Sequence, residues 1–218
     1  MEREEFLRRE EVRCEAYRLL AQCYYLPDKE LIEALEHSEE LARWRRAVSE
    51  NTWTGSDIDS LKVDYTKLFL GPYQSLAPPY GSIYLEKSRK VMGDSTMDAK
   101  QSYQEEGLDL TLKEVPDHVA VELEFIYYLV YREVEAIINN DETNIALYLK
   151  KQKIFLQNHL GKWVSEFTEN ILANTDKVFY QDIARITRSL VTEDLTTTFL
   201  SPVGQTAINR SLTQVSRT

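Results

Sequence analysis

Residues 64–84 read DYTKLFLGPYQSLAPPYGSIY, and this stretch carries the strongest local signals for the fold. Its apolar run before Gly71 is typical of a helix end, because glycine readily terminates helices. Three prolines then restrict the backbone of the connection, and Tyr73, Tyr80 and Tyr84 lie beside them. The stretch therefore predicts a helix, an aromatic loop and the start of another helix. Its tyrosines either bind a peptide at the surface or pack into the core, in which case the loop is an ordinary tight connection between two helices.

Outward from this loop, the rest of the chain also favours helix. Only seven glycines interrupt 218 residues, and apolar side chains recur at three- and four-residue steps. These stripes predict helices near residues 3–26 (stopped by Pro27), 28–37, 39–49, 58–71, 82–92, 95–106, 116–139, 145–173 (with a break near Gly161) and 179–190. Ser95 or Thr96 is expected to cap the helix at 95–106. We therefore expect an all-α fold, a single-domain bundle of about nine or ten helices.

Composition sets the domain organisation and excludes several partners. A hydrophobic content of 43% suffices for one sizeable core, and we predict a single domain at 1–195 with a possible hinge near 108–115. The tail at 196–218 is expected to be either partly disordered or a short docked helix. The net charge of −10 argues against nucleic acid and favours a basic partner. No stretch has the length of a membrane span, and the N-terminus lacks an apolar segment of signal-peptide type. We expect a cytoplasmic protein.

The candidate chemical groups admit structural explanations. Asp117 and His118 could support acid–base work, but Pro116 suits a first helical position and Asp117 would then stabilise the positive end of the helix dipole. A metal-dependent enzyme using His118, Glu122 and His159 is the alternative function, although such sites need further inward-facing ligands. Cys14 and Cys23 lie about 13 Å apart along one helix, too far for a disulfide. We predict no catalytic residues, no metal and no cofactor.

Three segments together resemble one protein family. The stretch at 64–84, the segment Glu114-Val115-Pro116-Asp117-His118 and the later run HLGKWV at 159–164 with Phe167 are similar to signatures of the TorD/DmsD/NarJ family of chaperones for molybdenum-containing redox enzymes. The resemblance covers roughly residues 10–190. It implies an all-helical, non-enzymatic protein that binds the twin-arginine signal peptide of a partner apoenzyme until the molybdenum cofactor is inserted.

The resemblance also implies a binding site and a set of partners. The peptide-binding residues carried over by the motifs are Tyr65, Leu68, Phe69, Pro79, Tyr80, Tyr84, Asp117 and His118. Tyr80 stands where tryptophan is common in the family, and Val115 interrupts the usual acid–proline start. The expected partners are the leader peptide and the apo-form of a molybdoenzyme catalytic subunit, bound by a monomer or a homodimer.

Overall fold

The computed structural model of the chain describes residues 2–48, 53, 57–71, 74–86, 92–109 and 115–196. The elements within them are α1 (Glu2–Gln22), α2 (Lys29–His37), α3 (Glu39–Val48), α4 (Ile58–Tyr65), the π-helical turn η1 (Thr66–Leu70), α5 (Gly81–Leu85), α6 (Asp94–Glu105), α7 (Val119–Ile138), α8 (Glu142–Asn158), α9 (Leu160–Asn174) and α10 (Val178–Thr196). The expected all-α bundle is confirmed for this part of the chain. The hinge candidate at 108–115 and the tail lie largely outside it.

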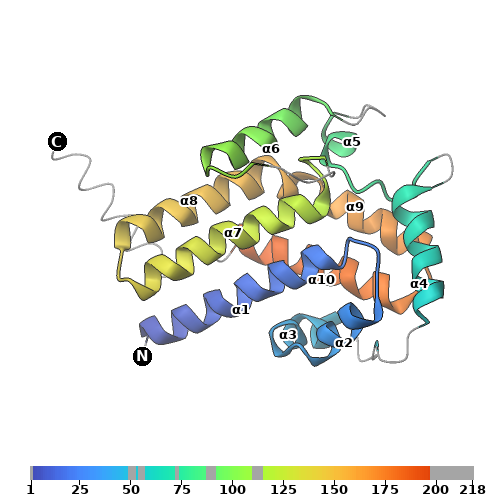
Figure 1. Cartoon of the computed structure of the whole chain (residues 1–218), viewed down its shortest axis with the longest axis horizontal. Helices are drawn as coiled ribbons and strands as arrows, with labels where there is room; N and C mark the ends of the chain where they lie inside the picture. The colour runs from blue at the N-terminus through green and yellow to red at the C-terminus, as the bar shows by residue number, and fades with distance from the viewer. Residues whose placement is uncertain are drawn as a thin grey trace.

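Helix α7 is the central element of the bundle. Figure 1 shows it side by side with α1 and α8, while α9 and α10 pair with each other and α6 runs along one edge. The predicted stripe of α7 is entirely buried: Val119, Leu123, Ile126, Val130, Val134 and Ile137. Each such side chain contributes about 1.5–3 kcal/mol when it leaves water, so this stripe accounts for the central place of α7.

A buried ionic group, the Arg13 cluster, joins four helices. Arg13 of α1 donates hydrogen bonds to Glu10 (2.6 Å), Glu133 of α7 (3.0 Å), Gln152 of α8 (2.8 Å) and Asp194 of α10 (2.8 Å). All five side chains are buried. The planar guanidinium, with five donors in a fixed geometry, allows one residue to hold four helices at once.

Several predicted helix boundaries were wrong, and tertiary contacts explain two of them. α1 ends at Gln22, before Pro27, because the chain turns there to bury Tyr24, whose hydroxyl donates to Thr187 of α10 (2.9 Å). The break between α8 and α9 falls at His159 (φ −121°, ψ −110°), two residues before Gly161. Gly161 instead permits close packing, since a Cβ there would lie 2.4 Å from the carbonyl oxygen of Leu156.

Two helix starts also differ from the sequence prediction. The N-cap residue of α6 is Gly93, and not Ser95 or Thr96 as predicted. Ser95 instead donates hydrogen bonds to Glu86 from its backbone nitrogen (3.0 Å) and its hydroxyl (2.7 Å). α5 ends at Leu85, within the expected range of 82–92, of which residues 87–91 are not described. α7 starts at Val119, so Pro116 and Asp117 lie in a turn before the helix.

Candidate functional site

The aromatic loop and the start of α7 are joined through their backbones. Tyr80 and His118 form an isolated antiparallel bridge. The amide of Val119 donates to the carbonyl of Pro79 (2.8 Å), and that of Gly81 donates to the carbonyl of Asp117 (2.9 Å). The ring of Tyr80 meets that of His118 edge to face, with 5.3 Å between centroids. The two segments singled out in the sequence therefore meet at one place.

His118 is the N-cap of α7. Its Nδ1 accepts a hydrogen bond from the amide of Ala120 (3.2 Å), which satisfies one of the free donors at the helix start. Burial lowers the pKa of His118 from 6.5 to about 4, so the ring is neutral at physiological pH. Capping, which the sequence suggested for this segment, is thus performed by His118 and not by Asp117.

Asp117 serves a different helix. Its Oδ2 accepts from the amide of Ser82 in the first turn of α5 (2.7 Å), and its side chain is buried. Its Oδ1 has no hydrogen-bond partner among the described residues. Asp117 therefore fixes the start of α5 to the start of α7 and retains an unused acceptor.

Glu122 lies one turn further along α7, behind the aromatic loop. Its Oε2 accepts from the indole nitrogen of Trp163 (3.0 Å), and burial raises its pKa well above the usual range. A Cβ on Gly81 would lie 2.9 Å from that indole nitrogen, so the loop approaches this closely only with glycine there. Tyr84 stacks on Trp163 at 5.4 Å between centroids and 16° between planes.

Unpartnered polar atoms gather around Asp117. Within the described part of the chain, Ser82 Oγ, Asp117 Oδ1, Glu122 Oε1 and His159 Nδ1 are buried without a hydrogen-bond partner. Asp117 acts electrostatically on both Glu122 and His159, and it raises the pKa of each. We call Ser82, Asp117, Glu122 and His159 the polar junction. Buried unpaired polar atoms are costly, so they suit water or a hydrogen-bonding group supplied by a ligand.

The predicted peptide-binding residues divide by exposure. Only Tyr80 has a half-exposed side chain; those buried are Tyr65, Leu68, Phe69, Pro79, Tyr84, Asp117 and His118. Phe69 packs against Tyr24, Tyr65, Phe167 and Tyr180 at centroid distances of 5.2–6.1 Å. The hydroxyl of Tyr84 donates to the carbonyl of Pro78 (2.9 Å). The buried members thus set the position of the loop that carries Tyr80.

The sequence prediction missed Tyr25. Its ring stacks on that of His118, with 6.1 Å between the centroids, and its hydroxyl donates a hydrogen bond to Glu124 (3.2 Å). Leu26 beside it is 55% exposed, and Leu76 in the aromatic loop is 46% exposed. The two neighbouring tyrosines at the end of α1 were the available signal, but nothing local distinguishes buried Tyr24 from half-exposed Tyr25.

The metal-enzyme alternative is not supported. His118 Nδ1 is used as a cap, Glu122 is bound to Trp163, and His159 Nε2 pairs with Asp98 (3.1 Å). Among the residues that the structure describes, no group of three or more His, Cys, Asp or Glu side chains could hold a metal ion. The same residues include no helix that is both long and apolar enough to cross a membrane.

Comparisons with known proteins agree with the expected family. Over 195 residues the chain is 28% identical to the Tat proofreading chaperone DmsD of Salmonella typhimurium, covering 84% of this chain and 88% of that one. It is 27% identical to the chaperone protein TorD of Vibrio parahaemolyticus, with 74% and 81% covered. A crystal structure from Archaeoglobus fulgidus, described as a redox enzyme maturation protein, shares the fold with a TM-score of 0.53 at 24% identity, covering 84% of this chain and 93% of that one.

The family assignment rests on the match to a family model. The model described as the nitrate reductase delta subunit matches residues 29–169, which is more than half of the chain. This range contains the aromatic loop, the start of α7 and Trp163, and so most of the candidate site. The chain therefore belongs to the nitrate reductase delta subunit family.

Proposed function

We propose that the protein is a chaperone, without catalytic activity, that binds the twin-arginine signal peptide of a molybdenum-cofactor oxidoreductase subunit in the cytoplasm before export. Relatives named Tat proofreading chaperone and chaperone protein support this class of function. The observation that carries the proposal is the backbone bridge between Tyr80 and His118, which presents a half-exposed aromatic side chain beside buried acidic groups.

The surface around Tyr80 suits such a peptide. Tyr80 and Tyr25 flank His118, while Leu26 and Leu76 add exposed apolar area for the hydrophobic part of a leader. Glu124 stands beside Tyr25, and the chain carries a net charge of −10, which attracts a basic peptide from a distance. Apolar contacts then provide the bulk of the affinity, and the charges provide orientation and rate.

A calorimetric titration of a twin-arginine leader into the full chain tests the proposal. We expect a dissociation constant in the micromolar range or tighter, equivalent to roughly −8 kcal/mol. Tyr80→Ala should weaken binding by about 1–2 kcal/mol, the usual effect of truncating an aromatic anchor. Binding should also weaken with added salt, because part of the attraction is ionic.

Two further variants make the test specific. Tyr131→Ala removes another exposed tyrosine, on the outer face of α7, and should leave binding unchanged. His118→Asn keeps a capping side chain but removes the ring between Tyr25 and Tyr80, and should weaken binding while α7 remains folded. A folded wild-type protein that ignores all twin-arginine leaders of candidate clients would contradict the proposal.

A further inference from the structure

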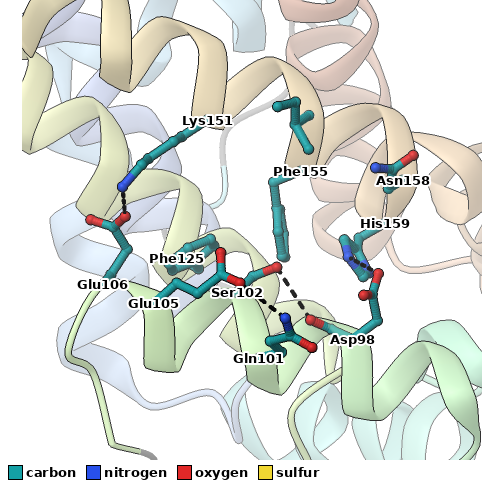
Figure 2. Close-up of a pocket in the computed structure, with 11 residues that line it drawn as sticks. Asp98, Gln101, Ser102, Glu105, Glu106, Phe125, Lys151, Phe155, Asn158 and His159 are labelled. Atoms are coloured by element: carbon teal, nitrogen blue, oxygen red, sulfur yellow. Dashed lines mark hydrogen bonds and ion pairs between the residues drawn. The ribbon is translucent and has the colours of Figure 1, made fainter.

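A pocket of about 250 Å³ lies between α6 and α8. Figure 2 shows Asp98, Gln101 and Glu105 of α6 on one wall and Phe155 and His159 on the other, with Phe125 of α7 at the base. Pockets for drug-sized ligands have volumes of about 300–1,000 Å³. This one therefore fits a single side chain or a similarly small group.

The base of the pocket and the wall opposite α6 are aromatic, and we call them together the floor of the pocket. The rings of Phe155 and His159 stack at 4.6 Å between centroids with 26° between planes, and Phe125 meets Phe155 edge to face at 4.7 Å. Both phenylalanines are buried, at 5% and 2% exposure. Such a floor attracts flat or cationic groups.

The charged groups that line the pocket are three carboxylates and one ammonium, those of Asp98, Glu105, Glu106 and Lys151. Glu106 already pairs with Lys151, which leaves the carboxylates of Asp98 and Glu105 to set the charge of the pocket. Asp98 is 65% exposed and pairs through Oδ2 with His159 Nε2 (3.1 Å), and Glu105 accepts from the side-chain amide of Gln101 (3.0 Å). A ligand that approaches from solvent therefore meets two carboxylates that can reorient toward it.

His159 adds an acceptor that nothing in the described chain uses. Its side chain is 3% exposed, and burial lowers its pKa, so the ring is neutral at physiological pH. A neutral ring that donates from Nε2 to Asp98 carries its lone pair on Nδ1, and Nδ1 has no partner among the described residues. The pocket thus combines an aromatic floor with two carboxylates, while the unpaired Nδ1 of His159 is buried.

We propose that this pocket receives the guanidinium of one arginine of the leader peptide. A guanidinium is planar and stacks on aromatic rings, and it has five donors and no acceptor, which complements a pocket lined by acceptors. His159 lines the pocket and is also a member of the polar junction, so the two features share a residue. The assignment rests on the proposed function and adds to it the site that recognises arginine.

The test compares leaders and protein variants in one set of titrations with the full-length chain. The leaders are the twin-arginine peptide and two peptides in which one arginine or the other is replaced by glutamine. The variants are Asp98→Asn with Glu105→Gln, and a control, Asp94→Asn with Asp109→Asn, which removes two exposed charges near the two ends of α6 outside the pocket. Circular dichroism and thermal melting confirm that each variant is folded.

We expect the pocket variant to bind the twin-arginine leader about five- to tenfold more weakly than wild type, the range of a partly exposed ion pair with a cation–π contact. It should also lose the preference for arginine over glutamine at one of the two positions, while the control variant keeps it. The NMR resonances of the His159 ring nitrogens should shift when the twin-arginine leader binds. They should not shift with the peptide in which glutamine replaces the arginine that the pocket prefers.

Two different failures can be told apart. If wild type binds the leader and the pocket variant discriminates arginine from glutamine as fully as wild type does, the arginine assignment is overturned and the chaperone function stands. If wild type binds none of the leaders, both proposals fail together.

Discussion

The Arg13 cluster and the polar junction are both buried in the same bundle, but their polar atoms are paired differently. In the Arg13 cluster, one guanidinium donates to three carboxylates and an amide from four helices. In the polar junction, Ser82, Asp117, Glu122 and His159 each retain an atom without a partner in the described chain. Among the described residues of the Arg13 cluster, only Glu133 Oε1 lacks a partner. The first arrangement therefore holds helices together, whereas the second leaves several buried polar atoms free for another molecule.

The two regions also differ in how they handle charge. The Arg13 cluster contains one cation and three acidic side chains, and burial raises the pKa of Glu133 to about 8, while the neighbouring Arg13 acts to lower it. The polar junction contains no cation of its own, and burial raises the pKa of Glu122 well above its usual range and lowers the pKa of His159. A cationic ligand would supply there the charge that Arg13 supplies in the other cluster.

The largest expected effect comes from breaking the paired cluster. Arg13→Met should lower the free energy of unfolding by about 3–5 kcal/mol, because it leaves buried carboxyl groups without their donor. Urea denaturation at pH 7 measures this loss. Arg9→Met is the matched control: Arg9 also pairs with Glu10 but is 46% exposed, so its loss should cost at most about 1 kcal/mol. Equal losses for the two variants would show that the Arg13 cluster has no special structural role.

Sequence alone predicted the helices whose stripes are long and regular. The buried stripe of α7 and the residues Phe179, Ile183, Ile186 and Leu190 of α10 follow helical spacing closely, and the structure buries them as expected. Helical spacing could not predict the end of α1 at Gln22 or the break at His159. The first depends on where Tyr24 packs, and the second on the packing between α8, α9 and α10.

The candidate site was predicted in part for a similar reason. The resemblance brought together Tyr80, Asp117 and His118, which the structure places at one junction. Tyr25 and the bond between Trp163 and Glu122 were missed because they depend on contacts between residues far apart in the chain. The Arg13 cluster likewise depends on the packing of α7, α8 and α10 against Glu10 and Arg13, which helical spacing does not show.

A smaller effect should come from the titration of His118 at the edge of the polar junction. Its pKa is about 4 in the folded chain and about 6.5 when unfolded, so the unfolded chain takes up the proton first as the pH falls. The contribution of His118 to stability is therefore complete above pH 6.5 and is lost progressively toward pH 4, by up to about 3 kcal/mol.

Comparison with His118→Asn isolates this contribution. The variant keeps a capping side chain, so the difference in unfolding free energy between wild type and variant should shrink or reverse between pH 6.5 and 4. A difference that stays constant over that range would mean that His118 is not held neutral by burial. Urea denaturation at several pH values provides the measurement.

The smallest expected effect is Glu122→Gln, and it separates the two clusters most sharply. Burial raises the pKa of Glu122 and so favours its neutral form. An amide of the same shape can still accept the hydrogen bond from Trp163, so the unfolding free energy at pH 7 should change by less than about 1 kcal/mol. The corresponding change in the Arg13 cluster, Asp194→Asn, removes a charge that accepts from both Arg13 and Tyr17 and should cost about 2 kcal/mol or more. Denaturation monitored by circular dichroism measures the change in unfolding free energy for both variants. If Glu122→Gln costs as much as Asp194→Asn, then Glu122 is ionised in the free protein, and the two clusters do not differ in how they handle charge.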